Sequence, residues 1–325
     1  MKSRLRSWLF VPGADARAHD AAAKSGADVI ILELEDFTPP ELRARARAMS
    51  RDALNQWRRA GARAAVRINP LETCGREDLI GVVAAQPDMI LMSKVAAPEQ
   101  VKALEEATGG AIDLVPNIES AAGLLRTFDI ARASKRVAAL LVASEDMVAD
   151  LGTARTRRGA ELDYVRARFL VECRAAGVEA IDAPYTFSDL PGAVAEARRS
   201  RRLGYRMKSL VDPAHARAIN RVFTPTRAQL EKARRIVAAF EKARAAGKDR
   251  AKVDGALIEV PIYAAAKRLL ADEREAVSRR KARSRRATSS GRSCCTQWPA
   301  PSTRWTPRMR VQACSRIRSR SPGFW

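Results

Sequence analysis

Acidic side chains and one arginine follow short apolar segments along this chain, and their types suit a divalent cation and an anionic ligand. The residues are Glu35, Asp36, Arg67, Glu119 and Asp146. With the other polar residues at the ends of these segments they would form a ring rich in carboxylates; those others are Glu33, Asn69, Lys94, Glu145, Asp182, Tyr185 and Asp212. Carboxylates that lie half-buried together must be paired, protonated or bound to a cation, because each unpaired charge is costly. No His or Cys stands at ligand spacing beside them, and oxygen-only ligands favour Mg²⁺, which takes one or two carboxylates plus waters and substrate oxygens. We expect Glu119 and Asp146 to hold Mg²⁺.

Arg67 would complement such a metal. Its planar guanidinium can bind a substrate carboxylate through two parallel hydrogen bonds. A single acid at the end of a strand is also commonly a helix cap or an ion-pair partner, and Glu35 and Asp36 could cap the helix that Pro40 begins. The functional interpretation therefore depends on these side chains meeting at one rim.

Eight short apolar segments would position them, and longer amphipathic stretches alternate with these segments. The segments are residues 7–11, 29–34, 64–69, 89–95, 112–118, 137–143, 179–184 and 206–211. Most are apolar throughout, as strands of a parallel sheet covered on both faces are. Helical patterns cover residues 15–25, 40–60, 98–107, 120–133, 160–176, 189–203 and 213–222. Eight strand and helix units predict a (β/α)8 TIM barrel, in which the strands end around one mouth.

The chain divides into three parts on this interpretation. Residues 1–223 form the barrel, and residues 224–275 form a C-terminal helical arm with helices at 227–246 and 262–275 and an extended piece near 253–260. Residues 276–325 hold 13 of the 59 basic residues and no acidic one, so the first 275 residues carry only +9 of the net +22. We expect this last segment to be a disordered basic tail, or a reading frame translated out of phase. A nucleic-acid-binding arm is the less favoured interpretation.

Composition narrows the class of protein further. No apolar run approaches the roughly 18 residues that a membrane-spanning helix needs, so no membrane segment is predicted. Only two of the five cysteines, Cys74 and Cys173, precede the basic tail, and they are far apart with no CxxC spacing. Neither a zinc site nor a disulfide framework is indicated, and a cytoplasmic location is the default.

Several motifs in a fixed order resemble the HpcH/HpaI aldolase and citrate lyase β-subunit family, which includes malyl-CoA lyases. The motifs are RSWLFVPG (6–13), LELED (32–36), VRIN (66–69), PNIESAAG (116–123), EDMVADLG (145–152) and AIDAPY (180–185). The resemblance extends over about residues 4–272. It implies that Glu119 and Asp146 bind Mg²⁺ and that Arg67 binds the oxo-acid part of the substrate.

The resemblance also implies a shared active site. Glu259 stands on an arm that would cover a neighbouring subunit's site and supply an acid/base group, in a homotrimer or hexamer. Glu35 and Asp36 are further catalytic candidates, and Arg6 is a candidate contact for CoA phosphates. The chain departs from the family pattern at Glu33 and Glu259, which replace Asp, at Ala143, which replaces Gly, and at Asp212, which replaces the His of a His-Pro pair.

We therefore expect a Mg²⁺-dependent carbon–carbon lyase that cleaves or forms a hydroxyacyl-CoA thioester such as malyl-CoA, citramalyl-CoA or citryl-CoA. One alternative is an aldolase that acts on free hydroxy-oxo acids without CoA. Another is a homologue that binds oxo acids without turnover, which the departures at Glu259 and Asp212 would favour.

Overall fold

The computed structural model describes residues 5–289, and eight parallel strands within them close into a barrel. The strands are β1 (Ser7–Pro12), β2 (Val29–Glu33), β3 (Arg63–Ile68), β4 (Met89–Met92), β5 (Asp113–Ile118), β6 (Ala139–Val142), β7 (Glu179–Tyr185) and β8 (Met207–Leu210). Each strand pairs with the next, and β8 closes the ring by pairing with β1, with Ser7 opposite Lys208 and Leu9 opposite Leu210. The predicted barrel is confirmed, and all eight strands overlap the predicted segments.

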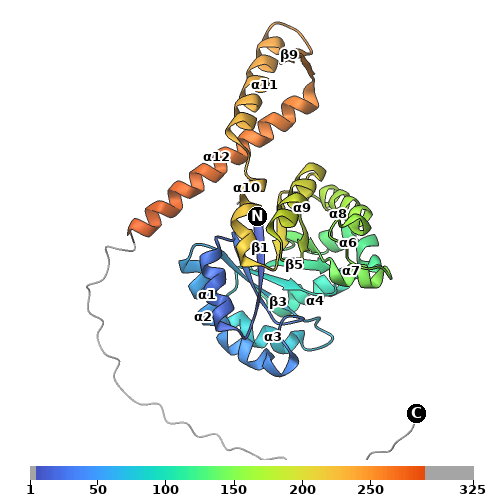
Figure 1. The fold of residues 1–325 in the computed structure, drawn as a ribbon, viewed down its shortest axis with the longest axis vertical. Helices are drawn as coiled ribbons and strands as arrows, with labels where there is room; N and C mark the ends of the chain where they lie inside the picture. Colours follow the sequence, from blue (N-terminus) through green and yellow to red (C-terminus); the bar gives the residue numbers. More distant parts are fainter. Residues whose placement is uncertain (1–4, 290–325) are drawn as a thin grey trace, which may run out of the picture. The chain divides into compact units, whose positions relative to one another are not determined.

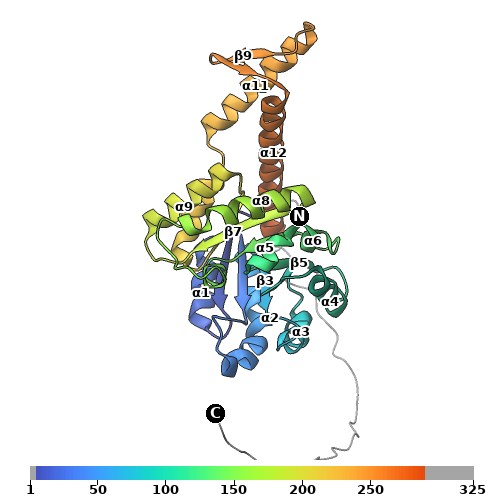
Figure 2. The same ribbon diagram turned by 90° about the vertical axis from the view of Figure 1, so that its right-hand side faces the viewer.

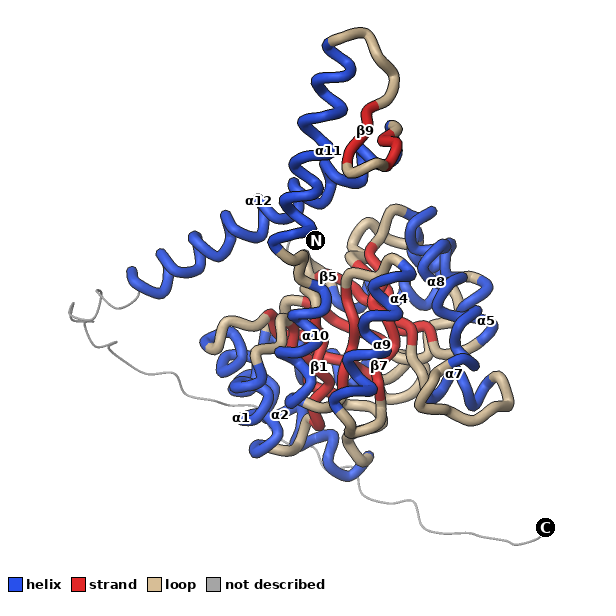
Figure 3. The backbone as a smooth tube through the Cα atoms, turned by 45° about the horizontal axis from the view of Figure 1, so that its top comes forward, coloured by secondary structure: helices blue, strands red, loops and turns tan. Residues whose placement is uncertain are grey.

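Helices surround the strands (Figure 1), and the tube view shows the helices in blue around the strands in red (Figure 3). They are α1 (Ala16–Ser25), α2 (Arg43–Arg59), α3 (Gly75–Val82), α4 (Pro98–Thr108), α5 (Ala121–Leu125), α6 (Thr127–Arg132), α7 (Glu145–Asp150), α8 (Asp163–Ala176), α9 (Leu190–Leu203) and α10 (Ala216–Phe223). The stretch predicted as one helix at 120–133 is two helices that meet at Arg126, whose backbone leaves the helical region. The short helices α3 and α7 were not predicted.

Alternation along each strand sorts side chains into two cores. Val29 and Ile31 of β2 belong to a cluster inside the barrel, with Trp8 and residues of the other strands. Ile30 and Leu32 belong to the larger cluster between the strands and the helices. Successive side chains of a strand point to opposite faces, so the face of a polar strand residue follows from its neighbours.

Local signals explain where the first helix begins and ends. The side chain of Asp15 accepts from the backbone N–H groups of Arg17 and Ala18, which leaves fewer unpaired donors at the start of α1. Gly26 follows the last residue with a φ of 79°, a left-handed conformation that glycine adopts without steric penalty. The strand β2 then follows directly, which places its carboxyl end at the mouth of the barrel.

An arm follows the barrel, and it has its own small core. It consists of α11 (Arg227–Ala245), a hairpin of β9 (Ala251–Val253) and β10 (Ala256–Ile258), and α12 (Val260–Ser289). Asp254 and Gly255 have φ of 51° and 79°, as the two central residues of a tight hairpin require. Phe240 of α11 stacks on Tyr263 of α12 at 4.6 Å.

The arm differs from the sequence expectation in one respect. Its last helix, α12, continues to Ser289, whereas the sequence predicted its end at residue 275 (Figure 2). The rest of the predicted basic tail, residues 290–325, lies outside the described residues. No helix within residues 5–289 is both long and apolar enough to cross a membrane.

Candidate active site

Arg67 projects into the barrel near its carboxyl end. It lies two residues after Ala65, which belongs to the inner core of β3. Its guanidinium carbon is 4.8 Å from the centre of the Phe10 ring and 5.9 Å from that of Phe37, within the range of cation–π attraction. Only 6% of Arg67 is exposed. The guanidinium is therefore desolvated and packed between two rings before any ligand binds.

The three nitrogens of the Arg67 guanidinium have carboxylate neighbours at different distances. Nε donates to Glu33 Oε1 at 2.8 Å, and Nη2 lies 3.1 Å from Glu35 Oε2. Within residues 5–289, the only carboxylate oxygen near Nη1 is Glu119 Oε1 at 3.7 Å, which is too far for a good hydrogen bond. Burial of the guanidinium alone would lower the pKa of Arg67, but these carboxylates outweigh burial and raise the pKa. The Nη1 edge is therefore the side of the guanidinium that remains for a ligand.

Glu33 supports both Arg67 and the loop that follows β2. Its side chain is fully buried, and it accepts from the backbone N–H groups of Glu35 at 2.7 Å and Phe37 at 2.6 Å. Burial raises the pKa of Glu33, although the charge of Arg67 opposes this. The carboxylate of Glu33 thus contacts the guanidinium and two loop amides at once.

Glu35 and Asp36 have different surroundings, although they are adjacent in sequence. Glu35 is 3% exposed and is paired with both Arg67 and Lys94, whose Nζ lies 2.6 Å from Oε1. Burial alone would raise the pKa of Glu35, but Arg67 and Lys94 outweigh it and lower the pKa. Asp36 is nearly half exposed, and its nearest cations are at 3.9 and 4.0 Å. Burial and the charge of Glu35 raise the pKa of Asp36 to about 6.

Glu119 forms an oxygen-rich corner with Asn117 directly after β5. Asn117 Nδ2 donates to Glu119 Oε1 at 3.3 Å. Oε2 of Glu119 and Oδ1 of Asn117 are buried without a hydrogen-bond partner among the described residues. Burial, only partly opposed by Arg67 and reinforced by the charge of Asp146, raises the pKa of Glu119 to about 8. Asp146 is partly exposed in the first turn of α7.

These residues fit a hard divalent cation. Glu119 Oε2 and Asn117 Oδ1 are buried without hydrogen-bond partners among the described residues, and a cation could bind both. A cation would also favour the ionised form of Glu119, which its acidic neighbours disfavour. Within residues 5–289, no cluster of three or more His, Cys, Asp or Glu side chains is arranged to hold a metal. The donor set at Glu119 and Asp146 suits Mg²⁺, which usually keeps waters and substrate oxygens as its other ligands.

Two tethers hold α7, the short helix that carries Asp146. The carboxylate of Asp150 accepts from the backbone N–H of Ala121, two residues after Glu119, at 2.7 Å. Thr186, in the loop after β7, donates its hydroxyl to Glu145 Oε1 at 2.7 Å. The first tether joins the segments of the two candidate metal ligands.

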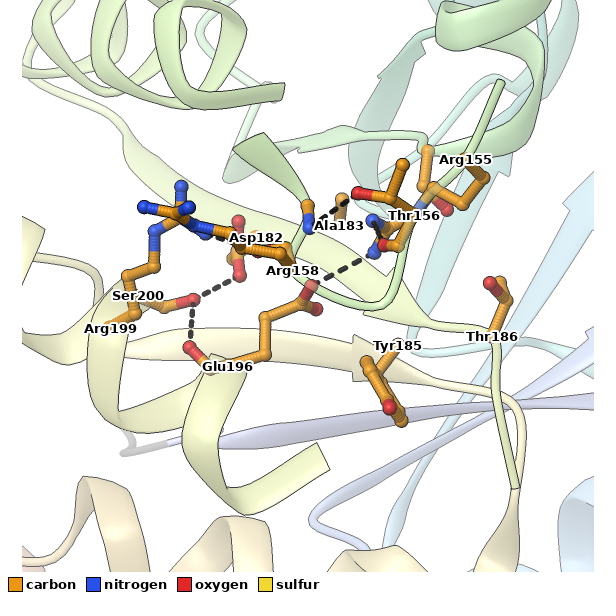
Figure 4. Close-up of polar contacts among 12 residues, drawn as sticks. Arg155, Thr156, Arg158, Asp182, Ala183, Tyr185, Thr186, Glu196, Arg199 and Ser200 are labelled. Atoms are coloured by element: carbon orange, nitrogen blue, oxygen red, sulfur yellow. Dashed lines mark hydrogen bonds and ion pairs between the residues drawn. The ribbon is translucent and has the colours of Figure 1, made fainter. Parts of the chain in front are cut away.

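A second charged cluster lies between the strands and the outer helices (Figure 4). Lys208 of β8 contacts Asp182 of β7 at 2.7 Å and Glu196 of α9 at 2.9 Å. Arg166 of α8 pairs with the same two acids at 3.0 Å each. Arg155, from the loop after α7, adds a pair with Glu196 at 2.9 Å, and these cations lower the pKa of Glu196 to about 2.

The structure therefore brings some of the polar residues that follow strands to the mouth and places others elsewhere. Asp182 was expected in the ring of carboxylates, but it faces outward because Ile181 occupies the inner face of β7. Asp212 caps a single 3-10 turn by accepting from the N–H of Ala214 at 2.8 Å. The expectation that Asp182 belongs to the ring is therefore corrected, whereas Asp212 caps this turn and still follows the carboxyl end of β8.

Two of the candidate site residues do not reach the mouth of this chain. Arg6 precedes β1 at the opposite end of the barrel, where its guanidinium binds Asp28 and Thr224, so its expected place near the mouth is corrected. Glu259 lies in the arm, and its charged neighbour is Arg250 at 3.9 Å. Its expected role requires a second chain and stays a prediction.

The sequence placed Glu33 and Lys94 in the ring of polar residues without giving either a role, and it gave Asn117 no place in the site, although a signal for Asn117 exists. Asn117 precedes Glu119 by two residues, which is the spacing of side chains on one face of a strand. Lys94 follows the apolar segment of β4 as Glu119 follows that of β5. Asn117 would have been found by including the strand residue two positions before Glu119.

Comparisons with known proteins agree on one group of relatives. The family model described as HpcH/HpaI aldolase/citrate lyase matches residues 6–213. The chain is 33% identical over 282 residues to the citrate lyase subunit beta of Haemophilus influenzae, covering 83% of this chain and 97% of that protein. It is 32% identical over 262 residues to a (3S)-malyl-CoA thioesterase of Cereibacter sphaeroides, covering 78% and 89%.

Solved structures are similar as well. CitE of Mycobacterium tuberculosis, in complex with magnesium, acetoacetate and coenzyme A, is 25% identical with a TM-score of 0.71, and the match covers 85% of this chain and 99% of that one. RipC of Yersinia pestis is 31% identical with a TM-score of 0.61, covering 71% and 100%.

Proposed function

Because this chain belongs to the HpcH/HpaI aldolase/citrate lyase family, we propose that it is a Mg²⁺-dependent carbon–carbon lyase acting on a hydroxyacyl-CoA thioester. Malyl-CoA, citramalyl-CoA and citryl-CoA are the candidate substrates. The observation that carries the proposal is the corner at which the Nη1 edge of Arg67 faces the partly unpaired carboxylate of Glu119. Magnesium, an oxo acid and coenzyme A in a similar structure support it.

Glu119 and Asp146 are the residues that would hold Mg²⁺. When bound, the ion would supply Lewis-acid polarisation of the substrate's hydroxyl or oxo oxygen. Arg67 would bind the adjacent carboxylate through Nη1, since its Nε and Nη2 are engaged by Glu33 and Glu35. This arrangement orients the bond between the hydroxyl-bearing carbon and the thioester's α-carbon before cleavage.

Cleavage requires that the substrate hydroxyl loses a proton and that the α-carbon of the thioester gains one. As the carbon–carbon bond breaks, its electron pair passes to the α-carbon as a thioester enolate, and the hydroxyl loses its proton to become the carbonyl. Asp36 is a better acceptor for this proton than Glu35, because Asp36 is nearly half exposed and has no cation as close as the two that contact Glu35. Glu259 of the arm, reaching from a second chain, is proposed to protonate the enolate.

Substitution of the metal ligands tests this function. Glu119→Gln and Asp146→Asn keep the shape of each side chain but remove its charge, so each is expected to lower Mg²⁺-dependent kcat/KM by at least about 100-fold. Glu106→Gln, on the exposed face of α4, is the matched control and is expected to keep full activity. Turnover that persists in both site variants would exclude the proposed metal site.

The name of one relative favours a second activity, hydrolysis of the thioester. The two reactions differ in their products: a lyase releases an oxo acid and an acyl-CoA, whereas a thioesterase releases a free thiol and a hydroxy acid. Assaying thiol and oxo acid in parallel on malyl-CoA distinguishes them. Free hydroxy-oxo acids in the same screen test the aldolase alternative, and binding of an oxo acid without any product would identify a non-catalytic homologue.

The shared-site part of the proposal predicts a homotrimer or hexamer. Leu257, Val260 and Ile262 of the arm expose apolar side chains, as a segment that packs against another chain would. Light scattering after size-exclusion chromatography measures the oligomer. Mixing Arg67→Ala chains with Glu259→Gln chains should restore part of the activity if each site uses residues of two chains, and no restoration would place the acid/base group within one chain.

A further inference from the structure

Lys94 has a backbone conformation that is unusual for its residue type. Its φ is 55°, and among the described residues only Gln86 and Asp254 are other non-glycine residues with positive φ. Gln86 ends a 3-10 turn and Asp254 lies in the hairpin turn, so local turns account for both. Lys94 instead follows β4 at the mouth. A left-handed conformation is strained for a non-glycine residue, and such strain is concentrated at functional sites.

The neighbours of Lys94 keep it in this conformation. The N–H of Ser93 donates to the carbonyl of Ile68, the last residue of β3, at 3.2 Å, and the N–H of Val95 donates to the carbonyl of Asn117, in β5, at 3.1 Å. The backbone is thus fixed on both sides by the adjacent strands. The side chain points to Glu35, with Nζ 2.6 Å from Oε1 and 4.0 Å from Asp36 Oδ1, and it remains 52% exposed.

This position places Glu35 between two cations. Glu35 lies 3.1 Å from Nη2 of Arg67 on one side and 2.6 Å from Lys94 on the other. Without Lys94, a carboxylate that is 3% exposed would have Arg67 as its single close cation. The buried carboxylate of Glu35 would then be stabilised only by a closer contact with Arg67. The guanidinium would turn toward Glu35, and its Nη1 would move away from the substrate corner.

We propose that Lys94 is a positioning residue that neutralises Glu35 and thereby keeps Arg67 Nη1 directed at the oxo-acid carboxylate of the substrate. The inference rests on the proposed function for the identity of that ligand. Lys94 acts through Glu35 and Arg67 on this view, and it does not itself take part in proton transfer.

The test is a binding cycle that needs no turnover. Oxaloacetate is titrated by calorimetry in the presence of Mg²⁺ into the wild-type protein, Lys94→Ala, Glu35→Gln and the double variant. Lys94→Ala is expected to weaken oxaloacetate binding about 10-fold, whereas in the Glu35→Gln background the same change should cost less than about 2-fold, because no charge remains to draw Arg67 away. Lys94→Arg should restore most of the loss.

Further measurements separate positioning from a structural role. Lys94→Gly removes the ammonium and relieves the backbone strain, so it should melt above Lys94→Ala yet bind oxaloacetate equally weakly. Binding of free CoA, which does not use Arg67, should stay unchanged in all variants. Equal losses from Lys94→Ala in both Glu35 backgrounds, wild-type binding in Lys94→Gly, or no oxaloacetate binding by the wild-type protein would each overturn the proposal. Failure of wild-type lyase turnover alone would overturn only the proposed function.

Discussion

The carboxylate of Asp150 accepts a hydrogen bond from the backbone N–H of Ala121 at 2.7 Å, and this contact joins the two segments that carry Glu119 and Asp146. Ala121 is the first residue of α5, and its N–H is one of the donors that a helix leaves unpaired at its start. An acidic side chain is favoured at that end of a helix. We therefore expect Asp150 to influence the distance between Glu119 and Asp146, although it contacts neither side chain.

Replacing Asp150 by Ala is expected to weaken Mg²⁺ binding about 10-fold, because residues that orient metal ligands from outside the coordination sphere typically contribute 10- to 100-fold. Thermal stability should change little, since Asp150 is exposed. Titration of Mg²⁺ followed by calorimetry measures the effect. Asp52→Ala, an exposed acid of α2, provides the comparison, and equal Mg²⁺ affinity of the two variants would show that the tether has no influence on the metal site.

The unusual ionisation of Glu119 predicts how stability depends on pH without metal. Its pKa rises from 4.5 to about 8 in the folded chain. The folded state then keeps a proton that the unfolded state releases, so the contribution of Glu119 is fully present below pH 4.5 and is lost as the pH rises toward 8. The melting temperature of the metal-free protein should therefore fall between pH 5 and pH 8.

Mg²⁺ should reverse this trend, because a metal ligand must be deprotonated and the ion then replaces the proton. The stabilisation by Mg²⁺ is expected to be larger at pH 8 than at pH 5. In Glu119→Gln, the fall with pH should be smaller and Mg²⁺ should have little effect. The same slope in the wild-type protein and in Glu119→Gln would refute the assignment to this carboxyl.

The outer charged cluster predicts a loss of stability that is separate from activity. Lys208→Met leaves the buried carboxylates of Asp182 and Glu196 with one cation fewer, and breaking a buried ion pair in this way costs about 3–5 kcal/mol. Lys102→Met, on an exposed position of α4, should cost less than about 0.5 kcal/mol. Denaturant unfolding of both variants measures the difference, and similar midpoints would mean that Lys208 is dispensable.

How far the sequence predicted this structure can be seen at two acids, Asp146 and Asp182. Both were assigned to the rim because each follows or ends an apolar segment. Strands of a parallel barrel are apolar on both faces, so the alternation that separates inside from outside in other sheets is absent, and Asp182 could not be assigned to the outer face. The barrel itself was predictable, because eight alternating units have few other arrangements.

Other features of the site depend on contacts that a sequence pattern does not contain. The helix α7 has six residues, too few for helical periodicity, although it sets the position of Asp146. The left-handed backbone of Lys94 is held by hydrogen bonds of Ser93 and Val95 to the two neighbouring strands. These partners are distant in the sequence, so the residues around Lys94 do not predict the bonds. The place of Glu259 requires a second chain.

The loop that connects α7 to α8 offers a matched pair of glycines. Gly152 and Gly159 have φ of 68° and 65°, so an alanine at either position would be similarly strained. A Cβ at Gly152 would meet nothing within 4 Å, whereas one at Gly159 would lie 2.9 Å from Arg155 Nη1 and 3.1 Å from Glu196 Oε2. The difference between the two substitutions isolates the contact with the charged cluster.

Gly152→Ala is expected to cost about 1 kcal/mol from backbone strain alone. Gly159→Ala should cost about 1–3 kcal/mol more, because the ion pair of Arg155 with Glu196 must be displaced. Nε of Arg155 also lies 3.8 Å from Glu145, the residue before Asp146, so the displacement should weaken Mg²⁺ binding as well. Denaturant unfolding and Mg²⁺ titration of both variants measure the two effects. If Gly159→Ala loses stability and keeps wild-type Mg²⁺ affinity, the charged cluster supports the fold without supporting α7.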